Sequence, residues 1–169
     1  MLKDSSKKTL ADLQEAFAGE SQANRKYLAF AKKADEEGFP QAAKLFRAAA
    51  DAETVHAHNH LREMGGIKST KENLQEAIEG ETHEFKDMYP AMMEDAKAED
   101  EDGANQSFYY ANSVEEIHAG LYKKYADSID SLEEVDIYVC QVCGNTVEGS
   151  APDVCSVCGN PKEKFKKID

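Results

Sequence analysis

The sequence has no long apolar run and little that would break a helix. Its 169 residues include only four prolines, and no stretch approaches the roughly 20 consecutive apolar residues that a membrane span requires. The first ten residues, MLKDSSKKTL, are too polar for a secretory signal. The length predicts one domain, or one domain with a small appendage, and the composition predicts a cytoplasmic protein with no membrane partner.

Positive charge is also scarce. Twenty Lys and Arg face 33 Asp and Glu, and the formal net charge is −13. Because such a chain repels the phosphates of nucleic acid, we expect no nucleic-acid partner. The excess lies in the body of the chain, since the last 32 residues, from Tyr138, hold four Lys and four Asp or Glu. A solvated acidic surface explains most of these carboxylates, but not all of them.

Up to about residue 131 the sequence predicts four long helices. Gly38 ends the first, and Pro40 suits the first turn of the second. Ser69 with Glu72 forms a capping box that opens the third helix, which Pro90 is expected to kink. The acidic stretch EDEDGANQ marks the turn into the fourth. The pattern indicates an all-α four-helix bundle.

Each predicted helix carries a glutamate within its apolar stripe, and two of them add a histidine three residues later. These residues are Glu20, Glu53, Glu81 and Glu115, with His56 and His118. A single acid on a stripe usually lies at the rim of a core. Four at matching depth would each cost free energy if unpaired, or would take up protons. A multivalent cation removes that cost, so the stripes predict a metal site.

A sequence repeat supports this interpretation. The phrase LQEAFAGES at residues 13–21 returns as LQEAIEGET at residues 74–82, and ExxHA occurs as ETVHA and as EEIHA. The first two helices therefore correspond to a duplicate of the last two, related by a pseudo-twofold axis. One Glu from each of two helices and Glu-x-x-His from the other two is the ligand set of di-iron and di-manganese bundles. The repeat predicts a site for two metals.

Other polar residues add less to the predicted site. Glu84 lies one turn after Glu81, where the first copy has Ala23, and a carboxylate on one side only would make the two metals inequivalent. Tyr27 either hydrogen-bonds a ligand carboxylate or packs in the core. We expect a solvated position for His58 and His83 and a hydrogen-bonded core position for His60.

The strongest single motif is CQVCGNTVEGSAPDVCSVCG, in which two C-x-x-C-G turns hold all four cysteines of the chain. Four thiolates in a tetrahedral array bind zinc or iron, and spacing alone does not decide between them. A zinc ribbon would be structural and often serves nucleic acid, which the net charge disfavours. A one-iron centre would carry electrons, which suits a neighbouring dinuclear site.

With both motifs in place, the chain resembles the rubrerythrins over its full length. The resemblance implies a ferritin-like bundle over residues 1–134 and a rubredoxin-like domain over residues 135–169. It assigns di-iron ligands to Glu20, Glu53, His56, Glu81, Glu84, Glu115 and His118, an Fe(Cys)4 centre to Cys140, Cys143, Cys155 and Cys158, and tyrosines beside the di-iron site to Tyr27 and Tyr89.

The resemblance also implies an activity, which is the reduction of hydrogen peroxide to water in defence against oxidative stress. Electrons would come from an NAD(P)H-dependent reductase or a rubredoxin and pass through the Fe(Cys)4 centre, so each chain would hold three irons. One iron would exchange His56 for Glu84 on oxidation, because an added negative ligand favours the ferric ion. Glu53 and Glu115 would bridge the metals.

A geometric argument adds an assembly. From His118 to the end of the fourth helix is about 16 Å at 1.5 Å per residue, so the C-terminal iron is expected to lie too far from its own di-iron site. A head-to-tail homodimer, or a higher homo-oligomer, would bring the C-terminal domain of one chain to the bundle of another.

Two other functions fit parts of the sequence. A ferritin-like ferroxidase or iron-handling protein would use the same bundle ligands, although it would need no electron relay. A non-enzymatic bundle with a structural zinc ribbon would bind one zinc in the C-terminal motif and would be colourless.

Overall fold

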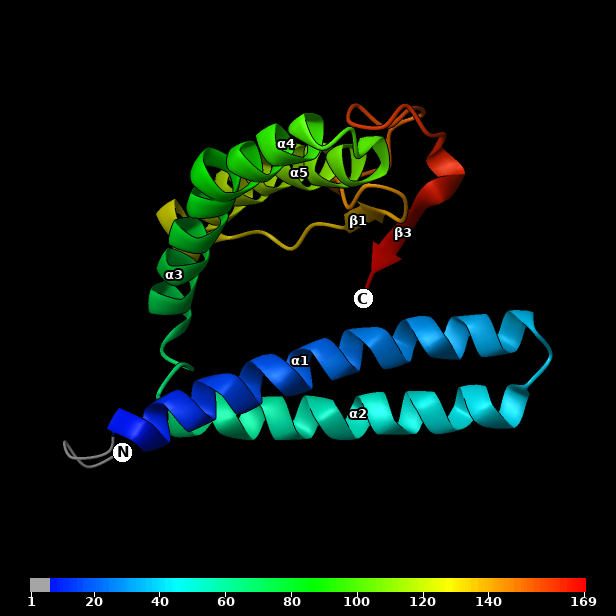
Figure 1. The fold of residues 1–169 in the computed structure, drawn as a ribbon. Helices are drawn as coiled ribbons and strands as arrows, with labels where there is room; N and C mark the ends of the chain where they lie inside the picture. The colour runs from blue at the N-terminus through cyan, green and yellow to red at the C-terminus, as the bar shows by residue number, and fades with distance from the viewer. Residues whose placement is uncertain (1–6) are drawn as a thin grey trace. The chain divides into compact units, whose positions relative to one another are not determined.

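The computed structural model describes residues 7–169, which are mostly helical with a small sheet at the C-terminal end (Figure 1). The chain forms two compact units, one ending at Lys68 and the other spanning Ser69–Asp169. Among the described residues, no helix is both long enough and apolar enough to cross a bilayer. The mostly helical fold with a separate cysteine-bearing end confirms the expected fold class.

The first unit is a hairpin of two helices, α1 (Lys7–Glu36) and α2 (Pro40–Glu63) (Figure 1). Pro40 occupies the first turn of α2, and Gly38 takes a positive φ of 80° between the helices, as their positions in the sequence predict.

The helices of this hairpin pack through small side chains. The buried residues of the interface include Ala31, Ala34, Ala43, Ala50 and Ala57. One polar residue joins them: the buried Asn24 donates from Nδ2 to the carbonyl of Ala50 at 2.7 Å and to Thr54 Oγ1 at 2.8 Å. Methyl-sized contacts let the two backbones approach closely, which brings the acidic residues of both helices together.

The second unit begins with α3 (Thr70–His83), a π-helical turn η1 (Glu84–Met88) and α4 (Tyr89–Ala98). The predicted capping box is confirmed, with Ser69 and Glu72 bonding each other's backbone N–H groups. The predicted third helix is therefore divided into α3 and α4, because the π turn interrupts its regular hydrogen bonding.

Pro90 gives the physical reason for this interruption. Proline has no N–H to donate, and the neighbouring Tyr89 N–H reaches back to the carbonyl of Glu84, which is a bond across five residues. The expected kink at Pro90 therefore takes the form of a π turn, a feature that is frequent at functional sites.

After α5 (Asp102–Asp127) comes a 3-10 turn, η2 (Ile129–Ser131), so the α-helix ends slightly earlier than predicted. A three-stranded antiparallel sheet follows in the order β2-β1-β3, built from β1 (Ile137–Cys140), β2 (Thr146–Glu148) and β3 (Phe165–Ile168), with a 3-10 turn η3 (Lys162–Lys164) before β3. We call residues 137–168 the cysteine domain. The division expected at residues 134 and 135 stays a prediction.

Candidate metal centres

The hairpin of α1 and α2 brings three of the predicted residues together, and we call them the hairpin half-site. They are Glu20, Glu53 and His56, whose candidate ligand atoms lie within 4.8 Å of one another. His56 Nδ1 is 2.8 Å from Glu53 Oε2 and 4.0 Å from Glu20 Oε1. The side chain of His56 is 54 % exposed, so this half-site is open.

The second unit holds a matching group, which we call the α5 half-site. Glu81 from α3 joins Glu115 and His118 from α5, again with ligand atoms within 4.8 Å of one another. His118 Nδ1 lies 2.8 Å from Glu115 Oε2 and 3.7 Å from Glu81 Oε1. Both half-sites thus show the same Nδ1 contact between residues three apart, as a duplicated hairpin predicts.

The closeness of the carboxylates in the α5 half-site changes their pKa values. Burial, a hydrogen bond to Glu115 and the charge of Glu115 raise the pKa of Glu81 to about 7. Burial also raises the pKa of Glu115. Without a cation the protonated form of Glu81 is favoured up to about pH 7, because two charged carboxylates at this distance repel each other. A divalent or trivalent metal replaces that proton, so the residues present fit a carboxylate-bound metal.

The π turn places two further predicted residues beside these carboxylates. Glu84 is half-buried at its start, and its charge contributes to the raised pKa values of Glu81 and Glu115. Tyr89 follows the turn and packs near Phe108, with ring centroids 6.3 Å apart. Burial first, and then the charges of Glu115, Glu84 and Glu81, raise the pKa of Tyr89, which keeps its hydroxyl protonated at neutral pH.

The remaining candidates lie as follows. Tyr27 packs in an aromatic cluster, with its ring centroid 6.3 Å from that of Phe30 and 6.2 Å from that of Phe46. His58 and His83 are exposed, which confirms their predicted solvated positions. His60 is half-buried.

The cysteine domain brings its four thiols into one cluster. Cys140 Sγ lies 3.7 Å from Cys158 Sγ, and Cys143 Sγ lies 3.6 Å from Cys155 Sγ. A tetrahedral centre with metal–sulfur bonds of about 2.3 Å has sulfur–sulfur edges of about 3.8 Å. All four cysteines are free, so the cluster fits one tetrahedral metal ion.

Hydrogen bonds to the sulfur of Cys155 stabilise its thiolate form. Burial alone would raise the pKa of the Cys155 thiol, but the backbone N–H groups of Cys158 and Val157 and the side chain of Asn145 lower it to about 6. Asn145 is 1 % exposed, and its Nδ2 lies 3.4 Å from Cys155 Sγ. Burial raises the pKa of Cys143. A thiolate at Cys155 is therefore favoured before any metal arrives.

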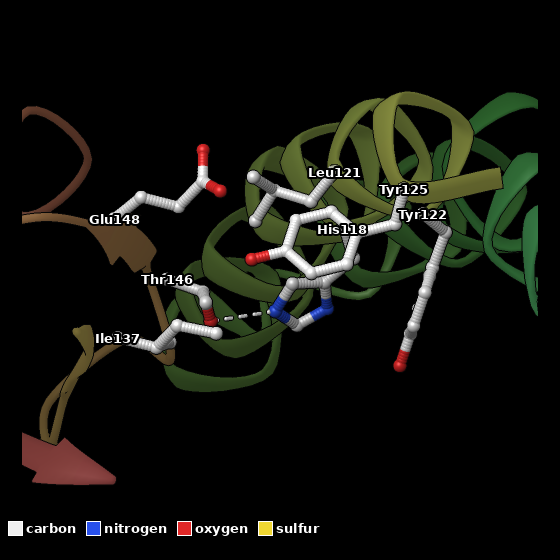
Figure 2. A pocket seen from close by; sticks show the side chains of 7 residues that line it. All are labelled: His118, Leu121, Tyr122, Tyr125, Ile137, Thr146 and Glu148. Atoms are coloured by element: carbon white, nitrogen blue, oxygen red, sulfur yellow. Dashed lines mark hydrogen bonds between the residues drawn. The ribbon is translucent and has the colours of Figure 1, made fainter. Parts of the chain in front are cut away.

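The cysteine domain packs against α5 of its own chain, and Figure 2 shows the contact. The imidazole of His118 points from α5 toward β2, where its Nε2 lies 2.9 Å from Thr146 Oγ1. Close by, Lys124 Nζ lies 2.5 Å from Glu148 Oε2. A pocket of about 230 Å³ lies at this contact and is lined by His118, Leu121, Tyr122, Tyr125, Ile137, Thr146 and Glu148.

This contact corrects one expectation. The C-terminal domain was expected to lie far from the metal ligands of its own α5, on the assumption that the chain continues away from the helix end. Instead, residues 132–136 turn the chain back, and the sheet packs alongside the helix. This contact removes the reason given for a head-to-tail dimer, and the dimer itself stays a prediction.

Sequence reasoning missed Thr146, Asn145 and Glu148. Asn145 and Thr146 stand directly after the Cys143-Gly144 knuckle, which is the one local signal of a role near the metal. No pattern in the sequence pairs Thr146 with His118, since the two residues are 28 positions apart.

Comparisons with known proteins match both parts of the chain. A family model described as rubrerythrin matches residues 12–126, and one described as rubrerythrin, rubredoxin-like domain, matches residues 138–166. Rubrerythrin-2 of Clostridium acetobutylicum is 35 % identical, over 91 % of this chain and 93 % of that protein. Nigerythrin of Nitratidesulfovibrio vulgaris is also 35 % identical, over 93 % of this chain and 85 % of that protein.

Solved structures of nigerythrin resemble the fold as well. A mixed-valence state matches with a TM-score of 0.58 and 33 % identity, over 99 % of this chain and 92 % of that one. A fully reduced, all-ferrous state matches with a TM-score of 0.59 and 32 % identity, with the same coverage.

Proposed function

Because this chain belongs to the rubrerythrin family, we propose that it reduces hydrogen peroxide to water at a carboxylate-bridged di-iron site. The family binds a di-iron centre and a rubredoxin-type iron, and the Glu/His groups and the four-cysteine cluster of this chain match both. The observation that carries the proposal is the contact between the cysteine domain and His118, which supports it because an electron-carrying centre would then lie beside a peroxide-reducing one.

When bound, iron supplies the redox chemistry by which peroxide takes up two electrons and two protons to give two molecules of water. The protein residues hold and tune that centre. Carboxylates suit hard cations and can bridge two of them, while imidazole favours transition metals. We assign the bridging role to Glu53 and Glu115. We assign Glu81 and His118 to one metal, and Glu20 with His56 or Glu84 to the other.

Two features of the second unit support an asymmetric site. Glu84 has no counterpart in the hairpin half-site, where Ala23 stands at the matching position. The π turn sets Glu84 near the charged cluster, where it influences Glu81 and Glu115. Beside them Tyr89 remains protonated, so its hydroxyl is available as a hydrogen-bond donor to a ligand or to substrate oxygen.

Electrons would reach the protein from a rubredoxin or an NAD(P)H-dependent reductase and enter through the Fe(Cys)4 centre. The reaction defends the cell against oxidative stress, and we place it in the cytoplasm. We further propose a homodimer or a higher homo-oligomer. Light scattering on the purified protein tests this assembly, and a fully active monomer would contradict it.

The decisive experiment is rapid mixing of the anaerobically reduced protein with one equivalent of hydrogen peroxide. We expect the ferric-thiolate colour of the cysteine domain to return quickly, because peroxide drains its electrons through the di-iron site. Glu81→Ala should abolish the fast return, because it removes a ligand of the α5 half-site. Glu79→Ala changes an exposed glutamate on the same helix and should leave the rate unchanged.

Other outcomes would favour the alternatives. A colourless protein with one zinc per chain would support the structural zinc ribbon. Fast oxidation of added ferrous iron, with colour that returns slowly and equally in Glu81→Ala, would support a ferroxidase whose two metal sites do not work together.

A further inference from the structure

Both ring nitrogens of His118 have partners in the structure. Nδ1 faces the carboxylates of the α5 half-site, 2.8 Å from Glu115 Oε2. Nε2 faces Thr146 Oγ1 at 2.9 Å (Figure 2). A neutral imidazole has one N–H and one lone pair, so the partner on one nitrogen decides what the other can do.

The hydroxyl of Thr146 has one proton, and that proton already has an acceptor. Thr146 Oγ1 lies 3.1 Å from the carbonyl oxygen of Gly144, which can only accept. The hydroxyl therefore donates to Gly144 and offers a lone pair to His118. Nε2 of His118 can use that lone pair only when it carries the N–H, and in that tautomer Nδ1 keeps its own lone pair for a cation placed between it and the carboxylates.

From this arrangement we propose that Thr146 is a positioning residue for the metal. Its hydroxyl holds His118 in the tautomer with the proton on Nε2, so that the Nδ1 lone pair is presented to a cation held by Glu81 and Glu115. The cysteine domain thereby controls how tightly the α5 half-site binds its metal. Such partners of a ligating histidine fix ring orientation and raise its basicity.

The backbone around Thr146 is held firmly enough for this role. Gly144 has a positive φ of 85°, and a Cβ atom at this position would lie 3.6 Å from Val114 Cγ1 on α5. The Gly144 N–H donates to the carbonyl of Cys140 at 2.8 Å, within the knuckle. The cluster of four cysteines, the Gly144 carbonyl and the Thr146 hydroxyl thus form one connected support for the imidazole.

The hairpin half-site shows that the duplication alone does not supply this partner. Within residues 7–68, His56 makes the same Nδ1 contact to Glu53, but its Nε2 has no protein partner. His56 is 54 % exposed and His118 is 27 % exposed. The sequence repeat would make the two histidines equivalent, and Thr146 makes them different.

Metal titration tests the proposal. Protein with zinc in the cysteine cluster is titrated with Co²⁺ at the bundle sites, and binding is followed by the visible absorption of cobalt. Thr146→Val replaces the hydroxyl with a methyl group of similar shape. It should lower the Co²⁺ affinity of the tighter-binding site by about 10-fold to 100-fold, the usual effect of losing a hydrogen-bond partner of a ligating histidine. Thr146→Ser restores a hydroxyl and should restore the affinity.

A second variant separates the hydroxyl from the docking of the domain. Glu148→Gln removes the charge that faces Lys124 on α5 but leaves Thr146 intact, and its Co²⁺ affinity should stay close to wild type. The proposal is overturned if Thr146→Val binds Co²⁺ as wild type does, or if Glu148→Gln weakens binding as much as Thr146→Val. It is also overturned if Thr146→Ser fails to restore the affinity.

This inference rests on the metal-binding part of the proposed function, and the experiment involves no peroxide. A loss of Co²⁺ affinity in Thr146→Val would stand even if the protein proved inactive toward peroxide. Conversely, a fast peroxide reaction in a variant with unchanged Co²⁺ affinity would leave the peroxidase proposal intact and remove only the role of Thr146.

Discussion

At the scale of single residues, protonation of the α5 half-site competes with metal binding. Glu81 has a pKa raised from its ordinary value of 4.5 to about 7 by burial and by Glu115. A raised pKa means that the folded state binds the proton more tightly than the unfolded state. The stabilising contribution is therefore complete below about pH 4.5 and is lost as the pH rises through about 7.

We accordingly expect the metal-free protein to lose thermal stability between about pH 5 and about pH 8. Metal-loaded protein should not show this pH-dependent loss of stability, because the cation replaces the proton. Thermal unfolding of chelator-treated and metal-loaded samples across this range measures the difference. Glu81→Gln cannot ionise and should flatten the profile of the metal-free protein; an unchanged slope in this variant would mean that other groups cause the loss.

Asn145 supports a second prediction at the same scale. Its Nδ2 donates to Cys155 Sγ at 3.4 Å from a fully buried position. Hydrogen bonds to sulfur stabilise the more negative, reduced form of an iron–thiolate centre. We expect Asn145→Ala to lower the midpoint potential of the Fe(Cys)4 centre, as measured by a redox titration of its visible absorption.

The matched control for Asn145 lies in the same knuckle region. Gln141 is exposed and donates to the carbonyl of Val139 rather than to a sulfur, so Gln141→Ala should leave the potential unchanged. Equal shifts in both variants would show that the polarity of the domain surface, and not the hydrogen bond to Cys155, sets the potential.

At the scale of elements, the hairpin of α1 and α2 depends on small side chains. Ala43 is 0 % exposed, so Ala43→Leu inserts a larger side chain into a contact with no free space. Overpacking of this kind typically costs about 1–3 kcal/mol. Chemical denaturation should show a loss of this size, whereas Ala42→Leu at the exposed neighbouring position should change stability little.

The elements themselves were largely predictable from sequence, because their determinants are local. Ser69 and Glu72 cap a helix through contacts three residues apart, and Gly38 with Pro40 marks a helix junction within one turn. The apolar stripes of the helices predicted which glutamates would lie close together within each half-site. The Cys-x-x-Cys spacing predicted a four-thiol cluster, which the structure confirms.

What sequence could not predict depends on contacts between distant residues. Pro90 predicted a kink in the helix. The π turn, however, depends on a hydrogen bond from the Tyr89 N–H to the Glu84 carbonyl, which the hydrophobic periodicity of the sequence does not predict. The contact between Thr146 and His118 depends on the chain turning back after α5. Counting helical rise from His118 gave the wrong result because it assumed that the chain continued in one direction.

At the scale of the whole molecule, the contact of the cysteine domain with its own α5 predicts which chain it serves. Cys155→Ser breaks the cysteine cluster, and His118→Ala breaks the α5 half-site. Co-expressed with different tags and purified as mixed pairs, these two variants should stay as inactive toward peroxide as either parent, because neither chain carries both intact parts.

Mixed pairs of wild type with Cys155→Ser provide the control, since they should retain the activity of the intact chain. Recovered activity in the pairs of Cys155→Ser with His118→Ala would show that the cysteine domain of one chain serves the α5 half-site of another. That result would reinstate the head-to-tail arrangement.

The short segment of residues 132–136, which returns the chain from the end of α5 to β1, has a further consequence. A tether of this length keeps the cysteine domain at an effective concentration of about a millimolar or more near its docking face. If electrons pass between the two metal centres as proposed, the rate of that transfer should not depend on the protein concentration. Only the first step, the encounter with an external electron donor, should slow when the cell makes less of either partner.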